Sequence, residues 1–160
     1  MPSLVMDSPS GWIEVSEEGG AITALDWTSA PADSAPPTPL LAEAKYQLED
    51  YFASRRDTFD LPLAPRGREF RHRVWQALRA IPYGETRTYG EVAASIGSAP
   101  RAVGGACGAN PIAIIIPCHR VVGSNGWQGG FSGGGGVTTK QALLELETTQ
   151  GRLSWPEATS

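Results

Sequence analysis

The hydrophobic pattern of this chain changes period partway along, and that change restricts the folds it can adopt. Near the N-terminus, turn-forming residues separate three short alternating segments, Leu4–Asp7, Trp12–Val15 and Ile22–Trp27. Alternation is typical of strands with one buried face, so we expect a small antiparallel sheet. From Phe70 onward the apolar residues recur with a helical period. The sequence therefore predicts an α/β protein in which a sheet precedes a mostly helical region.

The remainder of the first region holds a loop and one helix. Residues 28–39 contain four prolines and show no periodicity, which indicates a loop. A helix is expected over about 40–53, and residues 59–63 are a candidate for one more strand. Nothing in this region indicates chemistry, so we interpret it as a scaffold.

A second helix is predicted to begin at Phe70. Its apolar stripe consists of Phe70, Val74, Leu78 and Ile81. Pro82 to Gly84 should end it, and His72 falls opposite the stripe, at the surface. We place a domain boundary just before this helix, giving domains 1–65 and 66–160.

Residues 89–109 have the outline of a helix-turn-helix. A short helix over about 89–96 and a tight turn at 97–100 precede the segment 101–109. That segment is poor in helix formers and fits a loop as well as a helix. If it is helical, its lack of bulk would allow close approach to a partner.

The charge of the chain is polarised, although its net value is only -4. Residues 1–60 carry three basic and eleven acidic residues, whereas residues 61–160 carry ten and six. A basic half suits a polyanion bound through one face, and an ordinary solvated surface is the alternative. The sequence has no apolar run long enough for a membrane span and no signal-peptide pattern, so we expect a cytoplasmic protein with no membrane partner.

A thiol followed by basic side chains is the strongest chemical signal. After Asn110-Pro111, the apolar run Ile112–Ile116 is short enough for a buried strand, and Pro117-Cys118-His119-Arg120 follows it. An adjacent imidazole or guanidinium can help a cysteine become a thiolate, the reactive form. A buried structural cysteine beside a surface histidine is the alternative. The cysteines and histidines lack zinc spacing, so we expect no metal and no cofactor.

Glu147 strengthens the reactive interpretation. A helix over about 137–148 places Leu143, Leu144 and Leu146 on one side, and Glu147 falls within that stripe near the helix end. A buried carboxylate needs a partner, and we expect His119 to be that partner. Glu147 would then orient the imidazole that withdraws the thiol proton. A solvated glutamate at the end of the helix is the alternative.

A glycine-rich loop separates the thiol from this helix. Residues 123–136 contain one tryptophan, one phenylalanine and many glycines, so their backbone can approach a flat ligand closely. A phosphate-binding loop is excluded because no Gly-Lys-Ser/Thr follows.

Together these motifs resemble the O6-alkylguanine-DNA alkyltransferases. The resemblance is strongest from Phe70 to Glu147 and most specific in the Asn110-Pro111 to Val121 block. It implies a small N-terminal ribonuclease-H-like α/β domain packed on a mostly helical C-terminal domain with a winged-type helix-turn-helix. It also implies DNA repair by an irreversible, single-turnover transfer of a methyl or other alkyl group from O6-alkylguanine to the protein's own cysteine. Double-stranded DNA containing that lesion would be the partner, and the protein would be a monomer without DNA.

The resemblance also assigns roles to individual residues. It makes Cys118 the alkyl acceptor, His119 its water-mediated base, and Glu147 the residue that holds His119. Asn110 would tie the preceding turn to the active-site turn.

The same resemblance assigns the contacts with DNA and the damaged base. Tyr89 would contact the target base, and Arg101 would enter the base stack. Phe131 and Ser132 would line the guanine pocket, and we add Arg120 to the residues that contact DNA or substrate.

Two other functions fit parts of the pattern. A non-enzymatic alkylguanine binder of the same fold would carry tryptophan at the cysteine position, which Cys118 argues against. A thiol hydrolase using Cys118, His119 and Glu147 would turn over repeatedly and ignore DNA.

Overall fold

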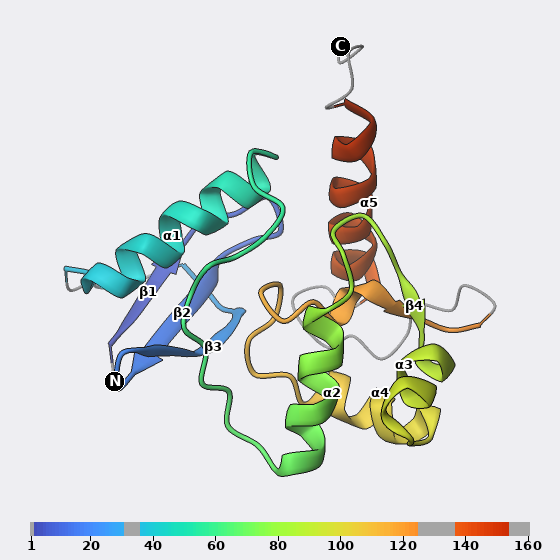
Figure 1. Ribbon diagram of the computed structural model, residues 1–160. Helices are drawn as coiled ribbons and strands as arrows, with labels where there is room; N and C mark the ends of the chain where they lie inside the picture. Colours follow the sequence, from blue (N-terminus) through green and yellow to red (C-terminus); the bar gives the residue numbers. More distant parts are fainter. Residues whose placement is uncertain (1, 31–35, 125–136, 154–160) are drawn as a thin grey trace.

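The computed structural model describes residues 2–30, 36–124 and 137–153. Its first part is an antiparallel sheet of β1 (Ser3–Met6), β2 (Ile13–Glu18) and β3 (Ala21–Trp27), in that order. Helix α1 (Pro39–Phe52) packs on this sheet (Figure 1). The three expected strands and the helix after them are confirmed.

Helix α1 and the sheet bury their facing side chains. Ile13 and Val15 of β2 alternate with partly exposed residues. On α1 the buried positions recur at helical spacing, and the Thr38 side chain caps the helix by accepting a hydrogen bond from the Leu41 amide. One face of the sheet and one face of the helix therefore form a shared core.

The second part is mostly helical. Its helices are α2 (Glu69–Arg79), α3 (Tyr89–Ile96), α4 (Pro100–Gly108), the short 3-10 helix η1 (Cys118–Arg120) and α5 (Val137–Leu153). Strands β4 (Arg87–Thr88) and β5 (Val121–Val122) form a two-residue parallel pair. The expected helix from Phe70 is confirmed, and the predicted α/β fold class is correct. No helix in the described parts of the chain is long and apolar enough to cross a membrane.

Helices α3 and α4 form the helix-turn-helix, so the loop interpretation of residues 101–109 is wrong. Thr88 and Glu91 make a reciprocal capping box at the start of α3. Gly97 ends α3 with a φ of 69°, a left-handed conformation that favours glycine. Pro100 then occupies the first turn of α4, where a proline costs no helical hydrogen bond. These local signals overcome the poor helix propensity of the segment.

Two of the expected strands are absent. Residues 59–63 form only an isolated bridge between Leu63 and Ile22. In the run Ile112–Ile116, Ile112 forms an isolated bridge with Leu25, and the residues after it form a buried turn in which Ile114 has a φ of 71°. Five consecutive buried apolar residues can form a strand or a turn, so the hydrophobic pattern could not distinguish these two conformations.

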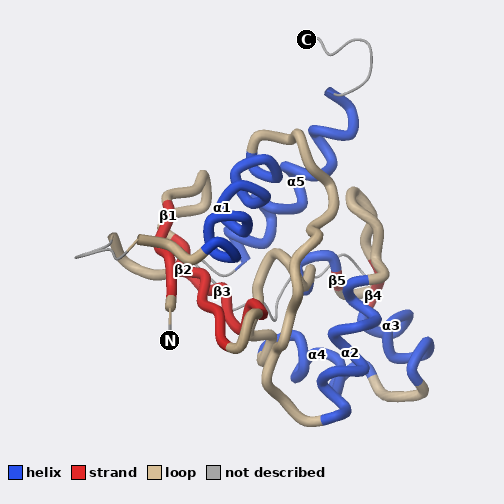
Figure 2. Tube along the Cα trace, turned by 60° about the vertical axis from the view of Figure 1, so that its left-hand side comes forward, coloured by secondary structure: helices blue, strands red, loops and turns tan. Residues whose placement is uncertain are grey.

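The two parts of the chain share one hydrophobic core. Helix α5 lies beside α1 in both views (Figures 1 and 2).

Helix α5 extends to Leu153, beyond the predicted end at 148. Glu147 is therefore inside the helix and not at its C-terminus as predicted.

Candidate active site

Cys118 begins η1 and is buried directly after the turn that contains Ile114. Asn110 organises this turn: its Nδ2 donates to the Ile116 carbonyl at 2.8 Å, and its Oδ1 accepts from the Ile112 amide at 3.0 Å. Interaction with the Asn110 side chain also lowers the pKa of the Cys118 thiol, against the larger effect of burial, which raises it. Asn110 therefore fixes the backbone before the thiol.

His119 and Glu147 meet in the interior. The distance from His119 Nε2 to Glu147 Oε2 is 2.7 Å, and the two side chains are 0% and 1% exposed. The pairing expected from the sequence is present, and the solvated alternative for Glu147 is wrong. His119 Nδ1 has no hydrogen-bond partner among the described residues. With Nε2 turned to the carboxylate, Nδ1 is the ring atom left to accept a proton.

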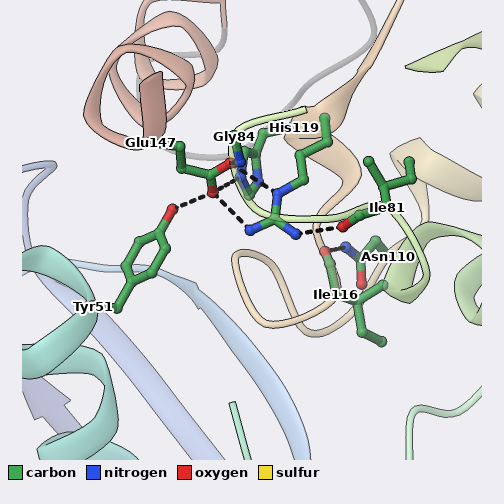
Figure 3. A network of polar contacts seen from close by, with 8 residues as sticks. Tyr51, Ile81, Gly84, Asn110, Ile116, His119 and Glu147 are labelled. Atoms are coloured by element: carbon green, nitrogen blue, oxygen red, sulfur yellow. Dashed lines mark hydrogen bonds and ion pairs between the residues drawn. The ribbon is translucent and has the colours of Figure 1, made fainter. Parts of the chain in front are cut away.

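Glu147 is the centre of a larger polar network (Figure 3). Tyr51 Oη donates to Glu147 Oε2 at 2.7 Å, and the Gly84 amide donates to Oε1 at 3.4 Å. Arg120 binds the same carboxylate through Nε at 2.8 Å and Nη2 at 3.0 Å. Burial raises the pKa of Glu147, but the hydrogen bonds and charges of His119 and Arg120 outweigh it and lower the pKa to about 2. Glu147 is therefore an anion at neutral pH.

Arg120 lies in the interior beside Glu147. It is 7% exposed, and its third nitrogen, Nη1, donates to the Ile81 carbonyl at 2.7 Å. All three of its nitrogens are thus bonded within the protein, and Arg120 neutralises Glu147. Its expected contact with DNA or substrate stays a prediction.

Burial keeps the thiol and its neighbouring imidazole uncharged at rest. It raises the pKa of Cys118, and the Asn110 side chain and the Lys140 charge oppose it only in part. Burial also lowers the pKa of His119, against the effect of Glu147. The resting pair is therefore a neutral thiol beside a neutral imidazole, so the thiol must lose its proton as it reacts.

The residues expected to contact DNA or the base have different surroundings. Tyr89 begins α3 and is buried, and burial followed by the neighbouring Cys107 and Cys118 raises its pKa to about 12. Arg101 is exposed near the start of α4. Phe131 and Ser132 lie outside the described residues.

Lys140 was missed by the sequence reasoning. It is 1% exposed on α5, donates to the Val121 carbonyl at 2.6 Å, and lies 5.7 Å from the centre of the Tyr89 ring. Its charge lowers the pKa of Cys118. Lys140 lies two helical turns before Glu147, so the argument used for that carboxylate would also have identified this buried ammonium.

Tyr51 was also missed, because it occupies an ordinary apolar position of α1 and only the tertiary structure brings it to Glu147. The described residues contain no group of three or more His, Cys, Asp or Glu side chains that could hold a metal ion.

Comparisons with known proteins match both parts of the chain to one protein family. A family model described as 6-O-methylguanine DNA methyltransferase, DNA binding domain, matches residues 69–149. A second, the ribonuclease-like domain of the same family, matches residues 3–65. The two matches define a class of α/β proteins in which a ribonuclease-like domain precedes a helical DNA-binding domain.

Individual relatives match over nearly the whole chain. A methylated-DNA–protein-cysteine methyltransferase of Mycobacterium tuberculosis (strain ATCC 25618 / H37Rv) is 47% identical over 152 residues, covering 91% of each chain. A constitutive protein of that name from Bacillus subtilis (strain 168) is 43% identical over 162 residues, covering 94% of this chain and 95% of the relative. The crystal structure of Mycobacterium tuberculosis OGT in complex with DNA superposes with a TM-score of 0.82 at 44% identity, covering 94% of each chain. This chain belongs to the 6-O-methylguanine DNA methyltransferase family.

Proposed function

We propose that this protein repairs O6-alkylguanine in DNA by moving the alkyl group onto the sulfur of Cys118, once per molecule. The supporting observation is the buried thiol, which follows a turn held by Asn110 and precedes an imidazole whose Nε2 is fixed by Glu147. Relatives named methylated-DNA–protein-cysteine methyltransferase add independent support.

The reaction is a displacement at carbon. The Cys118 sulfur attacks the alkyl carbon, and the bond from that carbon to O6 breaks with its electron pair retained by the guanine. The thiol proton passes to His119 Nδ1, directly or through a water, and Glu147 stabilises the imidazolium that forms. The restored guanine takes up one proton. Because water does not cleave the thioether product at neutral pH, the thiol is consumed and no cofactor is needed.

Helix α4 supplies the DNA-facing surface in this proposal. An alkylated guanine stacked in duplex DNA is out of reach of a buried sulfur, so the nucleotide must be rotated out of the helix. Exposed Arg101 would occupy the vacated space, and Tyr89 would contact the rotated base. A Cβ at Gly105 or Gly108 would meet no atom within 4 Å, so this face of α4 is bare. A face without bulk suits a minor groove only about 6 Å wide.

The remaining expectations also belong to this proposal. The partner is double-stranded DNA containing O6-alkylguanine, bound by a protein that is monomeric without DNA and works in the cytoplasm. We place the boundary between its scaffold and its catalytic domain at residues 65 and 66.

A stoichiometric repair assay tests the function. A duplex carrying O6-methylguanine with a radioactive methyl group is mixed with the protein at several ratios, and label in DNA and protein is counted. One methyl group should move per chain, and none should move to Cys118→Ser. Continued loss of label beyond one per chain would reject self-alkylation. Retention of all label on the DNA would indicate a binder or an unrelated thiol enzyme.

A further inference from the structure

Tyr51 connects the first part of the chain to the carboxylate of the site. It lies in the last turn of α1, is 0% exposed, and donates to Glu147 Oε2 at 2.7 Å across 96 residues of sequence (Figure 3). The same oxygen lies 2.7 Å from His119 Nε2. One carboxylate oxygen is therefore shared between a phenol and the imidazole beside the thiol.

The phenol is held in place and remains a donor. Its ring contacts those of Phe52, Phe59 and Tyr83, with centroid separations of 5.3, 5.4 and 6.2 Å. Burial, followed by the charge of Glu147, raises the pKa of Tyr51 well above its ordinary value. The phenol therefore keeps its proton at every pH at which the reaction would be studied.

The same part of the chain also holds the loop before the thiol. The Leu25 amide of β3 donates to the Pro111 carbonyl at 2.9 Å, and the Ala113 amide donates to the Leu25 carbonyl at 3.1 Å. The sheet thus fixes the backbone before Cys118 while α1 fixes Glu147.

We propose that Tyr51 is a positioning residue for the alkyl transfer, whose hydrogen bond to Glu147 Oε2 limits how strongly that oxygen holds the proton accepted by His119. This inference rests on the proposed function for its role in the reaction. Its effect on the imidazole can be measured without any reaction.

The direction of the effect follows from the sharing of one oxygen. Without the phenol proton, Oε2 has more electron density for His119 and stabilises the imidazolium more strongly. The pKa of His119, which burial lowers in the native protein, should then rise. Beyond His119 and Glu147 themselves, the charged or titratable groups acting on this pair are Tyr51 of α1, Tyr83 after α2, Arg120 of η1 and Lys140 of α5. Replacing one hydroxyl leaves all of these charges in place.

Two substitutions on one helix make the test. Tyr51→Phe removes the shared hydroxyl and keeps the packed ring, whereas Tyr46→Phe removes a hydroxyl from a tyrosine of α1 that is 56% exposed. Site-specific incorporation of a difluorotyrosine at position 51 gives a stronger donor of nearly the same shape. For each full-length protein, nitrogen NMR measures the His119 titration, and the rate with free O6-benzylguanine is measured as a function of pH.

The expected results differ in direction. Tyr51→Phe should move the His119 titration and the acid limb of the rate profile to higher pH, so that its rate falls below that of the native protein as the pH is lowered. Difluorotyrosine should move both to lower pH, and Tyr46→Phe should move neither. An unmoved titration in Tyr51→Phe would overturn the proposal whatever the rate. A native protein that fails to react with the benzylguanine would instead count against the proposed function, because the titration shift is independent of it.

Discussion

Replacing Glu147 with glutamine should cost both stability and reactivity, and the structure gives the size of the stability loss. The pKa of this carboxyl falls from 4.5 to about 2 in the folded protein. At roughly 1.4 kcal/mol per pKa unit, its charge contributes about 3 kcal/mol to the free energy of unfolding at neutral pH. An independent argument gives a similar value: removing one partner of a buried ion pair costs about 3 to 5 kcal/mol, because the other charge stays buried. Here that charge is Arg120.

Glu145→Gln is the matched control. Glu145 lies on the same helix, is exposed, and accepts a hydrogen bond from Gln141 at 3.1 Å. Its replacement should change the free energy of unfolding by less than about 0.5 kcal/mol. Urea unfolding of the native protein and both variants at neutral pH measures the difference. Equal and small losses in the two variants would refute the buried, paired state of Glu147.

The pH dependence of that difference gives a second check. Because the folded-state pKa of Glu147 lies below the unfolded value, its contribution is present above pH 4.5 and is lost as the pH falls toward 2. The stability gap between the native protein and Glu147→Gln should therefore shrink across this interval. A stability difference that is constant with pH would show that the charge of the carboxylate does not cause it.

Glu147→Gln should also lower the rate with free O6-benzylguanine by about 100-fold, because the proton acceptor His119 loses the anion that orients it.

Three further predictions concern DNA, the thiol and the fold. Arg101→Ala should slow repair of duplex DNA more than reaction with free O6-benzylguanine; equal slowing would remove its role in the base stack. Asn110→Ala should raise the pKa of Cys118, followed by the ultraviolet absorbance of the thiolate, and an unchanged titration would contradict an effect of the Asn110 side chain on the thiol. Gly67→Ala should destabilise the protein by about 1 to 3 kcal/mol, because a Cβ there would lie 2.6 Å from the buried Trp75 ring. Gly105→Ala, with nothing nearby, should raise the free energy of unfolding by up to about 1 kcal/mol. Equal thermal unfolding of the two glycine variants would refute that packing argument.

The sequence predicted the parts of the fold in which local pattern and tertiary burial agree. Alternation over Ile22–Trp27 and the helical stripe through Val74 and Leu78 each identify one buried face, and the structure buries that face. The run Ile112–Ile116 failed because its residues are buried on every side. Its turn is stabilised by the Asn110 side chain and by Leu25 of β3, and neither contact can be inferred from apolar residues alone.

The sequence predicted those site residues that a motif or a local pattern identifies. Cys118 and His119 are adjacent, and Glu147 was detectable as an acid on an apolar face, so their proximity could be inferred. The environment of Arg120 could not be inferred, because a basic residue after a thiol fits a DNA contact as well as a buried ion pair. Tyr51 had no local signal at all, since its hydrogen bond to Glu147 depends on where α1 lies relative to α5.

Localisation of the transferred methyl group tests the central claim most directly. After reaction with an O6-methylguanine duplex, the tryptic peptide spanning residues 102–120 contains both Cys107 and Cys118, so fragment masses must assign the modified sulfur. Burial raises the pKa of Cys107 to about 12, and no imidazole follows it in the sequence, so it should remain unmodified. We expect one added methyl mass on Cys118 in every reacted chain. A methyl group on Cys107, or an unmodified peptide after the lesion has been repaired, would contradict the account.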